Sequence, residues 1–153
     1  MSSYLSFYLV PVKSKSTYPG PEGNETIVEL NQTPLRLFTF CRSSDIYQQY
    51  YESLSPAYCG NSDKYTELTY EDTQKVIKDF KREEINPTEE RLKSLYKILK
   101  EAGYNEDVAS EIMSCESYLK DLNSSLKEME IISSVVYDVY DYSDFEKVLI
   151  NID

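Results

Sequence analysis

Histidine and tryptophan are both missing from this chain of 153 residues. Without histidine there is no Ser-His-Asp or Cys-His catalysis, no histidine-ligated zinc and no ordinary general base for neutral pH. The three cysteines, Cys41, Cys59 and Cys115, form no CxxC pair, so neither a disulfide framework nor a zinc knuckle is expected. We therefore predict a protein that is not an enzyme and that carries no metal or cofactor.

Long apolar runs are also scarce. The opening MSSYLSFYLVPVK holds an apolar run too short to span a bilayer, and no basic residue precedes it. Neither a signal peptide nor a membrane helix is expected. The unpaired cysteines fit a reducing cytoplasm best.

Basic side chains are too few to balance the acidic ones. The chain has 16 Lys and Arg against 27 Asp and Glu, a net charge of −11. Residues 104–153 alone hold three basic and twelve acidic side chains, a net charge of −9. Such an excess disfavours direct binding to nucleic acid or to an anionic membrane, because attachment to phosphates needs Lys and Arg. It favours a basic protein partner instead.

The pattern of apolar residues predicts a single α+β domain over residues 1–153. Residues 1–42 are mainly strands, at 3–12, 26–30 and 34–41, with a loop-like stretch from Lys13 to Gln32. The first strand has apolar or aromatic residues on both faces, which suggests cover on both sides. Residues 43–142 are helical. A strand over 144–152 is expected to return to the N-terminal strands, giving a small antiparallel sheet packed with a helical layer that contains one long helix.

Local signals place the helices. A helix starts at Ser43, Ser44 or Asp45 and ends before a connection that contains Pro56. Thr69 and Asp72 form a capping-box pattern for a helix over about 70–85. Pro87 opens a further helix that ends at Gly103.

A heptad seam runs through the last long helix, from Glu106 to about Asp141. It would span roughly 54 Å if it continues through the weak point Asn123-Ser124-Ser125. The residues of the seam, spaced alternately by four and three with one polar interruption at Ser133, are Val108, Ile112, Cys115, Leu119, Leu122, Leu126, Met129, Ser133, Val136 and Tyr140. The simpler interpretation is an intramolecular bundle, and the alternative is a homodimeric coiled coil.

The stretch VVYDVYDYSDFE, residues 135–146, interleaves carboxylates with tyrosines. Its acids point away from the seam, so a solvated outer face explains them without a ligand. A hard cation is a weaker alternative, because no glycine-bearing calcium loop is present. A third interpretation is mimicry of nucleic acid, in which spaced carboxylates and aromatic anchors fill a basic groove. The partner-binding residues predicted on this basis are Glu128, Glu130, Tyr137, Asp138, Asp141, Tyr142, Asp144 and Glu146.

A second polar cluster follows the strand at 34–41. Arg42, Ser43 and Ser44 could hold an anion at the start of a helix. The simpler interpretation is a helix N-cap made by Ser43 or Ser44, with Asp45 complementing the helix dipole. Of the nearby aromatic residues, Tyr47 and Tyr51 are expected to pack on the sheet.

Four segments together, SYLSFYLV, PLRLFTFCRSSDIYQQYYE, DKYTELTYEDTQKVIKDF and DFEKVLINID, resemble small accessory proteins of tailed bacteriophages. The resemblance lies in general texture and carries no defining motif. The resemblance implies a protein that acts in the cytoplasm of an infected bacterium and whose role is to bind another molecule. Such proteins include inhibitors of host nucleases, restriction enzymes and CRISPR effectors, and also assembly and structural accessory proteins.

Three hypotheses follow, in order of preference. The first is a non-catalytic acidic protein that inhibits a basic nucleic-acid-binding host protein, such as a defence nuclease, by electrostatic mimicry. The second is a self-assembling phage structural or assembly protein whose long helix oligomerises. The third is a phosphoesterase that uses carboxylate-bound metal.

Overall fold

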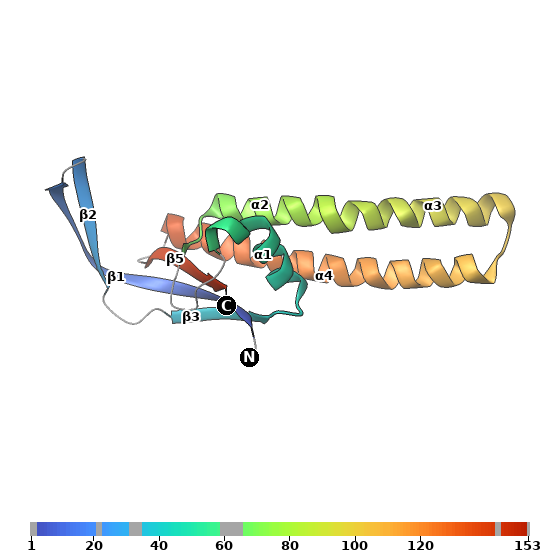
Figure 1. Cartoon of the computed structure of the whole chain (residues 1–153), viewed down its shortest axis with the longest axis horizontal. Helices are drawn as coiled ribbons and strands as arrows, with labels where there is room; N and C mark the ends of the chain where they lie inside the picture. Colours follow the sequence, from blue (N-terminus) through green and yellow to red (C-terminus); the bar gives the residue numbers. More distant parts are fainter. Residues whose placement is uncertain (1–2, 21–22, 31–34, 59–65, 143–144, 153) are drawn as a thin grey trace.

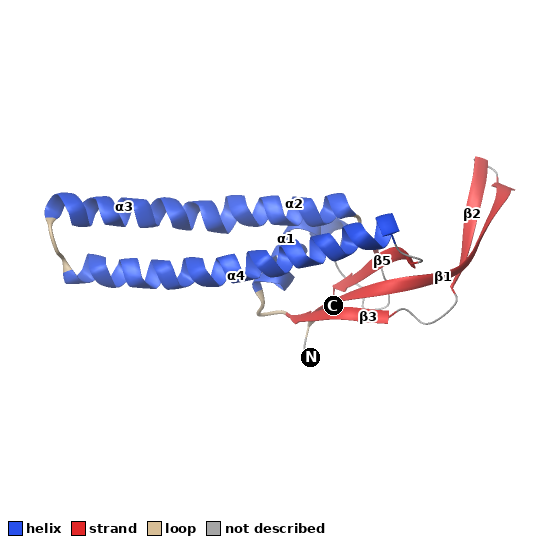
Figure 2. Cartoon of the chain, turned by 180° about the vertical axis from the view of Figure 1, so that it is seen from behind, coloured by secondary structure: helices blue, strands red, loops and turns tan. Residues whose placement is uncertain are grey.

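The molecule is elongated, with a helical hairpin at one end, a sheet in the middle and a two-stranded arm at the other end (Figure 1). This computed structural model describes residues 3–20, 23–30, 35–58, 66–142 and 145–152. The strands form antiparallel pairs, and the helices partly cover the sheet and partly extend beyond it, which makes the fold α+β as predicted (Figure 2).

The sheet is antiparallel throughout and is organised around β1 (Tyr4–Gly20). The first half of β1 pairs with β3 (Leu35–Cys41) on one side and with β5 (Phe145–Ile152) on the other, and β4 (Thr66–Glu67) lies beyond β5. The predicted return of the C-terminal strand to the N-terminal strands is therefore confirmed. The second half of β1 turns away and pairs with β2 (Gly23–Leu30) to form the arm.

The loop predicted between Lys13 and Gln32 is wrong in part. Residues 13–20 continue β1, and β2 begins at Gly23 rather than at 26. The sequence there is polar on both faces, so it lacks the alternation that marks a half-buried strand. Pairing between the two strands of the arm satisfies their backbone groups.

The first helix, α1 (Asp45–Tyr58), begins where the capping signal predicts. The hydroxyl of Ser44 accepts the backbone N–H of Tyr47 at 3.1 Å, which confirms the N-cap interpretation. The helix passes Pro56, which was expected in the following connection. A proline so close to a C-terminus removes one backbone hydrogen bond and leaves the helix intact.

The second helix, α2 (Tyr70–Phe80), opens with the predicted capping box between Thr69 and Asp72. Pro87 lies in the first turn of a further helix, as predicted, but that helix is not separated from the one before it. A π-helical segment (Lys81–Ile85) carries the chain without interruption into α3 (Asn86–Ala102). Proline cannot donate to the carbonyl one turn earlier, and the wider π turn, in which Asn86 N–H bonds Lys81 C=O, accommodates that loss.

The last helix, α4 (Glu106–Tyr142), is continuous over 37 residues and runs through Asn123-Ser124-Ser125 unbroken. Gly103 ends α3 with a φ of +81°, a conformation that favours glycine. The side-chain oxygen of Asn105 then accepts the N–H groups of Asp107 and Val108 and caps α4. Together α2, α3 and α4 form an antiparallel hairpin (Figure 2). The seam residues Ile112, Leu122 and Met129 are buried within it, as the bundle interpretation predicts.

The core lies where α1, the sheet and the sheet-proximal half of the hairpin meet. Phe7 of β1 and Tyr50 of α1 pack edge to face with ring centroids 5.3 Å apart, and both rings are buried. Tyr47 is buried as expected, whereas Tyr51 is exposed and stacks on Tyr47. Burying a large apolar side chain contributes about 1.5–3 kcal/mol. The stability of the fold therefore concentrates at this end.

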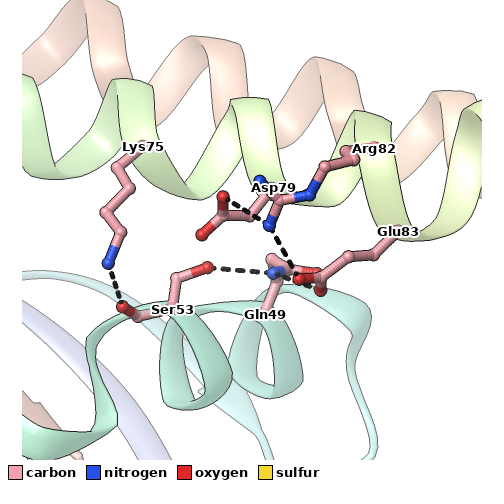
Figure 3. A network of polar contacts seen from close by, with 6 residues as sticks. All are labelled: Gln49, Ser53, Lys75, Asp79, Arg82 and Glu83. Carbon is pink, nitrogen blue, oxygen red and sulfur yellow. Dashed lines mark hydrogen bonds and ion pairs between the residues drawn. The ribbon is translucent and has the colours of Figure 1, made fainter.

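Polar contacts also join α1 to the hairpin (Figure 3). Buried Gln49 donates to Ser53 at 2.9 Å and to Glu83 at 3.3 Å. Lys75 donates to the backbone carbonyl of Ser53 at 2.8 Å. The guanidinium of Arg82 bridges Glu83 and the largely buried Asp79, at 3.1 Å in each case. The contacts of Gln49 and Lys75 hold α1 in place along the hairpin, whereas those of Arg82 lie within the hairpin itself.

Candidate functional site

A groove runs between α2 and α4 on the flank that α1 and the sheet leave uncovered. It has two adjoining hollows, of about 380 Å³ and about 280 Å³. The larger is lined by Tyr70, Gln74, Ile77, Lys81, Glu130, Ser133, Ser134, Tyr137 and Asp138. The smaller is lined by Thr69, Tyr70, Glu71, Tyr137, Tyr140 and Asp141. Tyr70 and Tyr137 belong to both hollows and divide one from the other.

The two dividing tyrosines come from helices that the capping box and the heptad seam bring side by side. Their ring centroids lie 5.3 Å apart at an interplanar angle of 67°, an edge-to-face arrangement. Tyr137 is 46% exposed, so much of its ring stays open to a ligand. The Asp141 carboxylate, one turn further along α4, raises the pKa of the Tyr137 phenol. That phenol is therefore neutral at any physiological pH.

The floor of the larger hollow is fixed by the polar interruption in the seam. The hydroxyls of Ser133 and Thr73 lie 2.7 Å apart in the core, and Gln74 donates to Ser133 at 2.7 Å. Thr73 also donates to the backbone carbonyl of Tyr70 at 2.6 Å. A buried polar pair of this kind sets the register between two helices, because any slip would leave it unsatisfied.

The smaller hollow ends at Tyr140, which ties three elements together. Its hydroxyl lies within donating distance of the Leu68 carbonyl at 2.9 Å and of Glu67 at 3.1 Å, and it accepts the N–H of Val148 at 3.4 Å. Partial burial raises the pKa of this phenol well above its ordinary value. Tyr140 thereby fixes the end of α4 against the start of α2 and against β5.

The groove is strongly acidic. Its described lining includes the carboxylates of Glu71, Glu130, Asp138 and Asp141 against the single ammonium of Lys81. Among the described residues, the ion pairs join Arg82 to Asp79 and Glu83, and Arg91 to Glu111. None of the groove carboxylates takes part in these pairs. Their charge therefore remains available to a partner.

The structure brings together four of the eight predicted partner-binding residues: Glu130, Tyr137, Asp138 and Asp141. Glu128 does not join them. It precedes Glu130 by two positions, and residues two apart lie about 200° apart around a helix axis, so Glu128 points to the opposite flank. Tyr142 ends α4 and Glu146 lies in β5, but their side chains fall outside the described set, as does Asp144 altogether.

Sequence reasoning missed the wall that α2 contributes, above all Tyr70, Glu71 and Lys81. The capping box located the start of that helix, but nothing in the sequence states which face of α2 lies beside the acids of α4. The alternative anion site at Arg42–Asp45 is occupied by contacts of the chain itself. Ser44 caps α1, and the Asp45 carboxylate accepts the hydroxyl of Ser125 at 2.8 Å.

Comparison with protein-family models, with curated proteins and with solved structures finds no match to this chain. Within the described part of the chain, no three or more carboxylate or cysteine side chains are grouped so that they could hold a metal ion. Nor does any described helix have the length and apolar character to cross a membrane. What the site does must therefore be argued from its own residues.

Proposed function

We propose that this protein is a non-catalytic binding protein whose acidic groove receives a basic surface of a nucleic-acid-binding protein. The observation that carries the proposal is the groove itself, in which carboxylates free of ion pairs flank two tyrosine rings on rigid helices. Carboxylates on a helix can occupy positions that phosphates would take, and tyrosines supply the large amphipathic contacts that anchor protein interfaces.

The partner class follows from charge and from the resemblance noted in the sequence. We propose a phage-encoded protein acting in the cytoplasm of an infected bacterium, where it inhibits a host defence nuclease such as a CRISPR effector or a restriction enzyme. An acidic protein that fills the basic channel of such an enzyme would exclude its substrate. Nucleic acid and this protein would then compete for one site.

Capture from a host lysate at low salt, followed by stepwise elution with salt, tests the proposal. A nucleic-acid-binding protein should be retained, should leave at moderate salt and should be displaced by added nucleic acid. The groove variant Glu130→Gln/Asp138→Asn should weaken binding roughly tenfold or more. The matched variant Asp121→Asn/Glu128→Gln removes the same charge from the opposite flank and should bind as the wild type does.

Two results would overturn the assignment. If both double variants weaken binding equally, net charge alone drives association and the groove is not the site. If the captured protein stays bound in concentrated salt and is not displaced by added nucleic acid, electrostatic mimicry is wrong. Inhibition of the purified nuclease by the wild-type protein, and its loss in the groove variant, would connect binding with function.

Self-assembly remains the second candidate, on a different basis from the heptad seam. The seam residues pack inside the hairpin, but the sheet-distal half has exposed apolar side chains at Ile98, Tyr104 and Met113. The exposed fractions of Tyr104 and Met113 are 81% and 71%. In the self-assembly proposal, these side chains would form the contact between copies of the chain. Light scattering over a range of concentrations decides the matter, because assembly requires a mass that rises with concentration. No observation favours the third candidate, the carboxylate-metal phosphoesterase.

A further inference from the structure

Each hollow of the groove combines the same three elements. It has tyrosine rings, two carboxylates in its lining and an open concave shape. Glu130 and Asp138 serve the larger hollow, and Glu71 and Asp141 serve the smaller one. Both volumes lie near or below the lower end of the range for small-molecule sites, which is about 300–1,000 Å³. Each hollow is large enough for one long side chain.

The shared ring of Tyr137 gives these hollows their selectivity. The edge of one tyrosine meets the face of the other, so the two rings form a corner instead of a flat stack. Ile77 adds an apolar wall to the larger hollow. A cation that enters must therefore leave part of its water behind and lie against an aromatic or aliphatic surface.

That requirement separates the two basic side chains of proteins. A guanidinium is planar, weakly hydrated and able to stack on a ring while its N–H groups bond carboxylates in the same plane. An ammonium is compact and strongly hydrated, and it gains less from a flat aromatic wall. A carboxylate pair beside a ring is thus matched to arginine more closely than to lysine.

We propose that the groove recognises arginine specifically, with two arginine side chains of one partner segment entering the two hollows on either side of Tyr137. The inference rests on the proposed function and refines it, because it names the residues by which a basic partner is chosen. Lys81, which also lines the larger hollow, leaves the smaller hollow as the more favourable of the two for a cation.

Two labelled peptides test the inference directly. Each is a Gly-Ser chain with two basic residues separated by a short Gly-Ser spacer; one carries arginines and the other carries lysines. Fluorescence anisotropy at low salt should show the arginine peptide binding about tenfold tighter than the lysine peptide. In Tyr137→Leu the ratio should fall close to one, whereas Tyr137→Phe keeps the ring and should keep the preference.

A second exposed tyrosine supplies the control. Tyr96 on α3 is 45% exposed, nearly the same fraction as Tyr137, and its hydroxyl donates to the carboxylate of Glu116. Tyr96→Leu therefore removes an equivalent ring outside the groove and should leave both affinities unchanged. If it lowers the arginine preference as much as Tyr137→Leu does, the preference does not arise in the groove.

The remaining outcomes separate this inference from the proposed function. Equal affinity for the two peptides, with both weakened by Glu130→Gln, overturns the choice of arginine and supports an acidic groove for any basic partner. If neither peptide binds while a lysate protein is still retained and released by salt, the arginine inference alone fails. If neither peptide binds and no lysate protein is retained, both fail.

Discussion

The two halves of the helical hairpin carry the same heptad pattern in different surroundings. In the sheet-proximal half, α2 packs on α4 while α1 and the sheet close a third side, and Leu122, Met129 and Val136 are fully buried. In the sheet-distal half, α3 packs on α4 alone. Leu95 and Ile112 are buried in that seam, but the flanks stay open to solvent. A heptad seam thus specifies which face is inward, whereas the number of neighbours decides how much stability results.

Polar side chains show the same contrast. In the proximal half, Thr73 and Ser133 bond each other inside the core. In the distal half, Arg91 and Glu111 form an ion pair at 2.9 Å in which both side chains are more than half exposed. A buried pair constrains register, while an exposed pair contributes at most about 1 kcal/mol. The proximal half is built for rigidity, and this is the half that carries the groove.

Truncation of a buried side chain should give the largest difference in unfolding free energy between the two halves of the hairpin. Met129→Ala, in the three-sided core, is expected to lower the free energy of unfolding by about 3–5 kcal/mol. Leu95→Ala should cost only about 2 kcal/mol, because two helices alone can collapse partway and the distal end can open locally. Urea unfolding followed by circular dichroism measures both. Equal losses would show that the third side adds nothing to the seam.

The turn at the distal tip should give the next largest effect. An added Cβ at Gly103 meets no atom within 4 Å, so any cost comes from its φ of +81°. Gly103→Ala is expected to destabilise the protein by roughly 1–3 kcal/mol. Hydrogen exchange should show faster opening of α3 and unchanged protection of α2. Uniformly faster exchange would mean that the hairpin unfolds as one unit and that the comparison between halves is wrong.

Removing the hydroxyl of Tyr140 should cost about 1 kcal/mol near neutral pH, because Leu68 loses a hydrogen-bond donor. The dependence of stability on pH in the alkaline range is a more specific test of this hydroxyl. Burial raises the pKa of this phenol in the folded state, while the unfolded chain ionises near pH 10. The unfolded state therefore releases the proton first, and stability falls as pH rises above that value. Tyr140→Phe cannot ionise, so its stability should fall less steeply in thermal melts above pH 10; identical slopes would contradict the assignment.

The smallest effect on stability should come from Lys81, an exposed residue that lines the larger hollow. Lys81→Gln should change the free energy of unfolding by no more than about 0.5 kcal/mol. It should nevertheless tighten binding of the arginine peptide, since it removes a like charge from the groove. Lys97→Gln on distal α3 is the matched control and should leave peptide affinity unchanged. Weaker binding in Lys81→Gln would place the partner's charge elsewhere.

Patterns with a strong local cause could be predicted from the sequence. The capping box at Thr69, the stop at Gly103 and the inward face of α4 all follow from short-range chemistry or from one periodicity. Errors arose where the expected local rule was overridden. Pro87 was expected to open a separate helix, but a π turn joins that helix to the preceding one. The sequence of the arm lacks the alternation of polar and apolar residues that predicts a strand. The backbone pairing of its two strands leaves no trace in hydropathy.

For the groove, the sequence supplied half of the answer. It identified the acids and tyrosines of α4, because the charges and the heptad period of one continuous helix can be derived from its own residues. It could not supply Tyr70 or Glu71. Helix periodicity alone puts Glu128 and Glu130 on opposite flanks of α4, but it does not say which flank faces the groove. The position of the groove depends on α1 and the sheet, because these elements cover one flank of the hairpin and leave the other flank open.

By itself the sequence determined the chemistry of this protein: a chain without histidine, a C-terminal third with a net charge of −9, and a long helix with one apolar face. Only the tertiary structure decided which of those charges stand together. Packing α2 against α4 in the register set by Thr73 and Ser133 brings residues 60 positions apart into contact. No local pattern encodes such a contact, because its free energy depends on partners distant in the chain.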